Sequence, residues 1–189
     1  MIPGRDRARA PLVVTTPRSG WWQCAGERGG GIACWLEVMR AVVASAPARD
    51  VLFCAFSGHE LGFLGATMLL ERRPELARQA YAWLHFGANI GAAVQPGVRF
   101  SGADDTLREL ASAALTRAGV TEAVAAPHGT IVGGESNVVA EHGARTIGLV
   151  GGNALFHLET DRYPRAVDVG AVARQAAAFS EVALTLAHD

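Results

Sequence analysis

Polar side chains that could carry acid–base or metal chemistry follow four short apolar runs of this sequence. Three of the six histidines lie at or directly after such runs. Imidazoles and carboxylates act as general acids and bases, and they are also common ligands of catalytic zinc. The distribution predicts a site built from the ends of several strands. Its members are Arg18, Trp21 and Glu27 after the first run, His59 and Glu60 after the second, His85 and Asn89 at the third, and His157 and Asp161 after the fourth.

The four apolar runs are the predicted strands. They span residues 11–16, 51–56, 81–86 and 146–150, and the continuous run at 51–56 predicts a strand buried on both faces. Predicted helices cover residues 32–46, a stretch after 62, one from 74, one from 104 or 105 to 119, and one from about 166 to 187, whereas 127–137 predicts a loop. Strands that alternate with helices indicate a layered α/β fold with a largely parallel sheet. In such a sheet, ligands bind at the carboxyl ends of the strands.

The composition is that of a folded domain and excludes several functions. Half of the 189 residues are hydrophobic and the net charge is −1, so we expect no nucleic-acid partner. All 17 basic residues are arginines, which excludes a Walker A lysine, a Schiff-base lysine and a Ser–Lys pair. No apolar stretch approaches the length of a spanning helix, and we expect no membrane association.

The cysteines and the N-terminus bear on the compartment. Cys24, Cys34 and Cys54 are odd in number and form no Cys-x-x-Cys pair, which favours a reducing compartment. Residues 1–10 are polar and rich in arginine, unlike a signal peptide, so we expect a cytoplasmic protein. We expect one domain over residues 1–189, with the abrupt start indicating a possible excised piece of a longer protein. The oligomeric state stays open.

Three stretches of the sequence resemble metallopeptidase family 28, which holds the co-catalytic zinc aminopeptidases and the single-zinc glutaminyl cyclases. The strongest likeness is FSGHELGFLGA at 56–66, similar to a strand-end motif in which two adjacent Glu precede Leu-Gly. Phe156-His157 followed by Asp161 looks like the last metal-ligand His and its Asp, and residues 25–33 look like the segment with the bridging Asp. The resemblance implies a three-layer α/β/α sandwich with a mostly parallel central sheet, as in the zinc aminopeptidases.

The sequence departs from the family pattern at the metal ligands. The first-strand His-x-Asp motif would fall at residues 16–18, which contain neither His nor Asp, and the third-strand Asp ligand is missing as well. The bridging Asp falls on Glu27, the second Glu on Glu60 and the last His on His157. The resemblance therefore leaves the ligand set of one zinc ion, while the family's general base falls on His59.

Two readings of this ligand set remain open. Two carboxylates and an imidazole can hold a zinc ion with water as the fourth ligand, and His59 beside them could take the water's proton. Alternatively, Glu27 pairs with the adjacent Arg28, and the nearby Arg18 adds positive charge that opposes a dication. The sequence predicts at most one zinc ion per chain and leaves open whether it is bound.

Other residues are candidates for covalent catalysis or substrate binding. Cys24 could be a nucleophile with a histidine base, but a free cysteine among Ala and Gly is more often a small buried residue. Ser136 lacks the final Gly of a nucleophile elbow. Arg18 could orient a substrate carboxylate through its planar guanidinium. The predicted substrate-binding residues are Arg18, Trp21, His85, Asn89, Glu135, Ser136, Asn153 and Asp161.

The function that follows is hydrolysis of an amide, peptide or ester bond in a small-molecule or peptide substrate. The attacking water would be activated by a single metal, by His59, or by both. One alternative is a catalytically dead pseudo-peptidase that binds a ligand or peptide. A further alternative is a single-zinc cyclase or acyl transferase, which the pattern of lost ligands allows.

Overall fold

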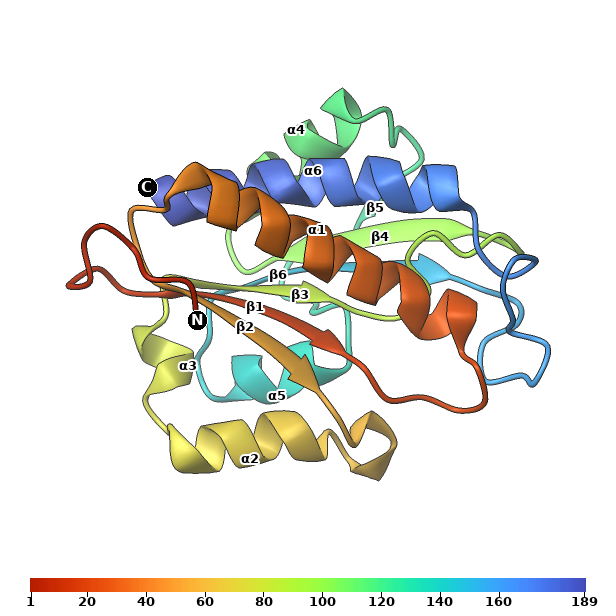
Figure 1. Ribbon diagram of the computed structural model, residues 1–189, viewed down its shortest axis with the longest axis horizontal. Coiled ribbons are helices and arrows are strands. Elements are labelled where there is room, and N and C mark those ends of the chain that lie inside the picture. The colour runs from red at the N-terminus through yellow and green to blue at the C-terminus, as the bar shows by residue number, and fades with distance from the viewer.

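Six strands form one mixed sheet at the centre of the computed structural model, which describes residues 1–189 (Figure 1). The strands are β1 (Leu12–Pro17), β2 (Val51–Phe56), β3 (Ala82–Phe86), β4 (Gly97–Gly102), β5 (Val124–Ala125) and β6 (Thr146–Gly152). Their order across the sheet is β2-β1-β3-β6-β4-β5. The four predicted strands are thus adjacent and mutually parallel, whereas β4 runs antiparallel to β6.

Helices cover both faces of this sheet. One layer holds α1 (Gly30–Ser45), α4 (Asp105–Arg117) and α6 (Val169–His188), and the other holds α2 (Leu64–Arg72), α3 (Leu76–Gln79) and α5 (Glu135–Glu141) (Figure 1). A core of 27 buried residues lies under α1, α4 and α6, and a second core of 10 lies under α2, α3 and α5. Because burial of apolar surface is the main favourable term in folding, the first layer contributes more to stability than the second. The predicted three-layer α/β sandwich is confirmed.

Several details differ from the sequence-based predictions. The strand at 51–56 is β2, which lies at an edge of the sheet with Ala55 exposed, so the prediction of burial on both faces was wrong. Strands β4 and β5 were missed, because the first has glycines at both ends and the second is two residues long. The predicted loop at 127–137 ends earlier, where α5 begins at Glu135.

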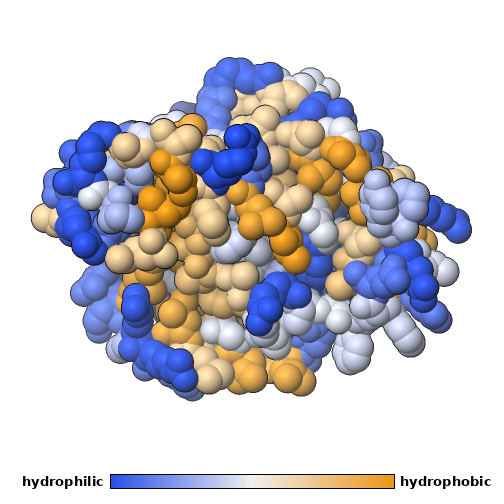
Figure 2. Space-filling view, in the orientation of Figure 1, coloured by the Kyte–Doolittle hydropathy of each residue, from blue (hydrophilic) through white to orange (hydrophobic).

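Hydrophobic and hydrophilic residues lie side by side on the face that Figure 2 shows. Large exposed apolar residues are found on α1 and in the loops that follow β1, β2 and β6. None of the helices combines the length and the apolar character needed to cross a lipid bilayer.

The start of α1 packs directly on the loop that follows β3. A Cβ atom on Gly30 would lie 1.8 Å from the carbonyl oxygen of Ile90, so this contact requires glycine. Gly29, one residue earlier, would place a Cβ atom in open space. The close approach places the segment before α1 against the strand ends, where the candidate site lies.

We expect Gly30→Ala to lower the free energy of unfolding by roughly 1–3 kcal/mol, because the added methyl group must push α1 away from the backbone at Ile90. Gly29→Ala is the matched control and should leave stability unchanged or raise it by up to about 1 kcal/mol through helix propensity. Denaturant unfolding of the two variants checks this. Equal stabilities would contradict the close contact.

Candidate active site

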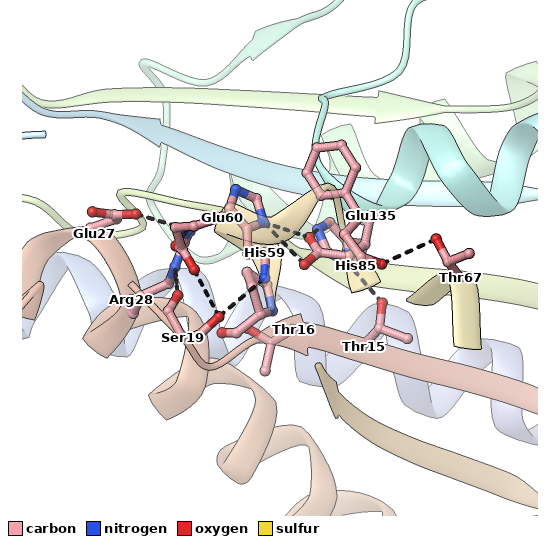
Figure 3. Close-up of polar contacts among 12 residues, drawn as sticks. Thr15, Thr16, Ser19, Glu27, Arg28, His59, Glu60, Thr67, His85 and Glu135 are labelled. Carbon is pink, nitrogen blue, oxygen red and sulfur yellow. Dashed lines mark hydrogen bonds and ion pairs between the residues drawn. The ribbon is translucent and has the colours of Figure 1, made fainter. Parts of the chain in front are cut away.

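The predicted site residues gather where β1, β2, β3 and β6 end, as the sequence analysis expected. His59 and Glu60 form the short helical turn η2 (His59–Leu61) after β2, and Glu27 lies in a π-helical turn, η1 (Ala25–Gly29), before α1. His157 lies within 3.5 Å of Glu27, so His59 and His157 are at the same end of the sheet. Figure 3 shows that the polar side chains form two neighbouring clusters.

The first cluster, which we call the carboxylate–arginine cluster, consists of Glu27, Arg28, Glu60 and Ser19. One nitrogen of Arg28, Nη2, lies 2.8 Å from Glu27 Oε1 and 3.2 Å from Glu60 Oε1 (Figure 3). Arg28 Nε donates to the Ser19 carbonyl at 2.6 Å, and the Ser19 hydroxyl donates to Glu60 Oε2 at 3.0 Å. The guanidinium is therefore fixed between two carboxylates by contacts on several sides.

Backbone contacts hold Glu27 and Arg28 in place. Asp161 is buried, and its two carboxylate oxygens accept hydrogen bonds from the amides of Gly26 at 2.7 Å and Glu27 at 2.9 Å. The amide of Asn89 donates to the Glu27 carbonyl at 2.9 Å. Asp161, predicted to bind substrate, thus supports the turn that carries Glu27.

The two carboxylates of this cluster differ in their electrostatics. Burial raises the pKa of Glu27, and the positive charge of Arg28 opposes that rise. Burial also acts to raise the pKa of Glu60, but hydrogen bonds from its own backbone, Ser19 and Arg28 outweigh it and lower the pKa. Glu60 is therefore the firmer anion, whereas Glu27 depends on the cation beside it.

The second cluster, which we call the histidine–glutamate cluster, consists of His59, Glu135, His85 and Thr15. Glu135 is 1% exposed, and its two oxygens lie 3.0 and 3.1 Å from His59 Nδ1 (Figure 3). His85 Nε2 lies 3.9 Å from Glu135 Oε2, and its Nδ1 lies 2.9 Å from the Thr15 hydroxyl. A buried carboxylate thus lies between two imidazoles that come from different strand ends.

Burial and hydrogen bonding set the charges of this cluster. Burial lowers the pKa of His85 to about 4, so its ring is neutral at pH 7. Burial acts to raise the pKa of Glu135, but the hydrogen bond from His59 and the nearness of both imidazoles outweigh it and lower the pKa. An ionised Glu135 holds the proton of His59 on Nδ1 and leaves Nε2 free to accept one.

His59 and His85 open on a cavity of about 140 Å³. This volume admits several water molecules or a small substrate group. Its walls come from the ends of β1, β3 and β6 and from the loop before α5. The lining residues are Pro17, His59, His85, Gly87, Ala88, Val132, Gly133, Gly134, Glu135, Val150 and Phe156.

The other predicted substrate-binding residues lie around this region in different settings. Arg18 and Trp21 are exposed in the segment after β1, and Ser136 is buried at the start of α5 without lining the cavity. Asn89 Oδ1 and Asn153 Nδ2 are buried without a hydrogen-bond partner, and neither residue lines the cavity.

Cys24 is poorly suited to the role of nucleophile. Burial, and next the negative charge of Glu27, raise the pKa of its thiol above the ordinary value. Cys24 therefore stays protonated at neutral pH, and a thiol is much less reactive than a thiolate.

The histidine–glutamate cluster was the main feature that sequence reasoning missed. Glu135 and His85 were both named as substrate contacts, but nothing in the sequence joins Glu135 to His59, 76 residues earlier.

The sheet order and the site at the strand ends define an aminopeptidase-like α/β fold. The chain belongs to peptidase family M28, whose family model matches residues 15–183. No curated protein matches the chain in sequence.

Solved structures confirm the fold at low sequence identity. A zinc aminopeptidase from Bacillus subtilis, BSAP, aligns with a TM-score of 0.79 and 16% identity, covering 96% of this chain and 47% of its own. The LapA aminopeptidase of Legionella pneumophila gives 0.78 and 14%, covering 96% and 52%. Nicastrin, a component of gamma-secretase, gives 0.74 and 10%, covering 98% and 42%. The chain thus spans about half the length of these proteins.

The family likeness suggests zinc, and BSAP is a zinc enzyme, but the residues present here do not fit the ion. The structure does bring the predicted ligands Glu27, Glu60 and His157 together, yet Arg28 Nη2 contacts the carboxylate oxygens that a metal would use. No group of three or more His, Cys, Asp or Glu side chains is arranged to hold a metal ion. Zinc would require Arg28 to move out of the carboxylate–arginine cluster.

The buried neutral His85 should make the protein less stable in mild acid. Between pH 6.5 and about 4 only the unfolded chain protonates this imidazole, so the free energy of unfolding falls as the pH falls through that range. The loss is about 2 kcal/mol between pH 6.5 and 5. We expect His85→Gln to remove this part of the pH dependence, measured by urea unfolding at both pH values.

His142→Gln is the matched control, because His142 is exposed on the surface. Its pH dependence should equal that of the wild type. A slope that persists in His85→Gln would show that His85 is not the residue that titrates on unfolding.

Proposed function

We propose that this chain hydrolyses an amide, peptide or ester bond, with His59 as the general base that activates water. The observation that supports the proposal is the hydrogen bond between His59 Nδ1 and the buried Glu135, beside a cavity at the strand ends. Membership of peptidase family M28 supports peptide hydrolysis in general. The substrate we propose is a peptide or a small molecule.

In the proposed mechanism His59 moves protons and Glu135 orients it. Glu135 accepts from Nδ1, so Nε2 takes a proton from a water molecule as the water oxygen attacks the substrate carbonyl carbon. The protonated His59 then donates from Nε2 to the leaving nitrogen or oxygen as the bond to carbon breaks. Glu135 stabilises the imidazolium during this interval because the carboxylate is buried beside it.

His85 is placed to polarise the substrate carbonyl. It lines the same cavity, and its Nε2 is buried without a hydrogen-bond partner. If the Thr15 hydroxyl donates to Nδ1 rather than to the Leu84 carbonyl 3.4 Å away, the ring proton is on Nε2, 3.9 Å from Glu135 Oε2, and could be donated to a substrate oxygen instead. A neutral imidazole held this way can donate a hydrogen bond to developing negative charge.

The residues outside the cavity would contact the rest of the substrate. Arg18 is exposed after β1 and can pair with a substrate carboxylate, and the exposed Trp21 offers an apolar surface nearby. Asn89 Oδ1 and Asn153 Nδ2 lack hydrogen-bond partners but are buried, so they would bind peptide groups only after a local rearrangement. All four residues belong to the predicted set of substrate-binding residues.

In this proposal the reaction does not depend on a zinc ion at Glu27, Glu60 and His157. The version with one zinc ion, and the single-zinc cyclase that shares its ligands, both require the Arg28 guanidinium to leave its two carboxylates. The contacts of that buried side chain oppose such a movement, since each separated charge would stay poorly solvated.

Binding without turnover is the second candidate function, and one observation favours it. The guanidinium of Arg28 supplies charge but cannot lose a proton, so it cannot activate a water molecule as a metal can. A domain of this fold that recognises a peptide or small ligand at the same cavity would then lack catalysis. Kinetic measurements separate the two candidates.

We expect His59→Ala to lower kcat/KM on aminoacyl p-nitroanilides or p-nitrophenyl esters by roughly 10²–10⁴-fold, the usual range for a lost general base. Glu135→Gln keeps the shape of the side chain and removes its charge, so it should cause a smaller loss. His142→Ala is the control, since this exposed histidine lies outside the cavity. Turnover by the wild type should survive prolonged dialysis against EDTA.

Two results would count against the proposed mechanism, and a third would count against hydrolysis itself. An unchanged rate in His59→Ala would show that this imidazole is structural. Loss of activity with EDTA, restored by zinc, would favour the single-metal mechanism. Absence of turnover on amides, esters and N-terminal glutaminyl peptides would favour binding without catalysis.

A further inference from the structure

We propose that the Arg28 guanidinium is a built-in cation in the place of a metal ion, and that its removal lets Glu27, Glu60 and His157, which as they stand are not arranged to hold an ion, close around a divalent metal. The inference concerns the charge that these side chains require, so it does not depend on whether the chain hydrolyses anything. It follows from the geometry, the burial and the unused ligand atoms of the carboxylate–arginine cluster.

The geometry places one cationic nitrogen where a bridging ion would lie. Arg28 Nη2 is within 3.2 Å of one oxygen from each of the two glutamates. The Arg28 and Glu27 side chains are 2% and 1% exposed, and that of Glu60 is 14% exposed. Two carboxylates in so little water need a cation between them, and Arg28 is the one that contacts both.

The side chains around Arg28 retain unused capacity for a metal. Glu27 Oε1 is paired with Arg28 Nη2 at 2.8 Å, whereas Glu27 Oε2 is buried without a hydrogen-bond partner. His157 Nε2 lies 3.5 Å from Glu27 Oε1, which is the same oxygen that contacts Arg28 Nη2. Two carboxylates and an imidazole are a ligand set that zinc accepts.

The guanidinium also explains why the native chain should not take up the ion. Arginine stays charged at all relevant pH values, so the cluster always contains a fixed positive charge. A dication approaching within a few ångströms would be repelled strongly where water is scarce. It would also have to displace Arg28 from the Ser19 carbonyl and from both glutamates.

The test compares Arg28→Ala with the wild type, using zinc or manganese chloride alone as the probe. After metal loading and dialysis, elemental analysis should find about one equivalent of metal bound to Arg28→Ala. In the wild type it should find no metal that depends on Glu27 and Glu60. At a free metal concentration about a hundred times Kd, the melting temperature of Arg28→Ala should rise by roughly 5–10 °C. The wild type should show no such shift.

Two controls isolate the proposed ligands. The double variant Arg28→Ala with Glu27→Gln keeps the vacated space but loses one anionic ligand, and it should lose the gained metal binding. Arg49→Ala removes a different buried arginine, which stacks on the ring of Tyr81, and it should gain no metal. Gain of metal in Arg49→Ala would show a general effect of lost positive charge.

The variant remains informative if it folds poorly, because metal should supply the missing charge. Folding of Arg28→Ala only in the presence of zinc would support the proposal. Failure to fold with zinc present, or a folded Arg28→Ala that binds no metal, would overturn it. One equivalent of zinc on the wild type that Glu60→Gln abolishes would overturn it as well, since Arg28 would then not occupy the site.

Discussion

The contact of Arg28 with two carboxylates is the interaction on which the strand-end region depends. The parallel strands bring Glu27 and Glu60 to one edge of the sheet, where the helices on both faces leave little room for water. Without a cation the pair would repel, and an unpaired buried charge typically costs several kcal/mol. Asp161 adds a further buried carboxylate to this region, and its two oxygens accept hydrogen bonds from the backbone amides of Gly26 and Glu27.

A short turn after β2 links the two clusters of the site. His59 and Glu60 are adjacent in η2, and their side chains point to different partners, Glu135 and Arg28. The left-handed backbone of Gly58 and Gly62, at φ 74° and 73°, permits this tight turn on both sides. A displacement of Arg28 would therefore reach His59 through Glu60 and the Ser19 hydroxyl, which accepts from the His59 amide.

The elements that carry the site could be predicted from the sequence, whereas the pairing of its side chains could not. The apolar runs, each followed by a glycine-containing loop, located four adjacent parallel strands. Parallel strands are largely apolar, and their carboxyl ends lie at the same end of the sheet, where the polar residues gather. Sequence neighbours such as Glu27 and Arg28 show their pairing only once the π-helical turn is known. The contact of His59 with Glu135 depends on tertiary packing of α5 against the sheet, and no local pattern encodes it.

In this chain a guanidinium, Arg28, contacts the two carboxylates at the strand ends. A dication and a guanidinium both neutralise carboxylates, but they differ in chemistry, because only the metal lowers the pKa of a bound water. Where arginine takes that position, any proton transfer must come from another group within reach of the cavity. The imidazole of His59 lines the cavity and has a buried carboxylate partner, so in the proposed mechanism the carboxylate–arginine cluster provides charge balance and the histidine–glutamate cluster provides proton transfer.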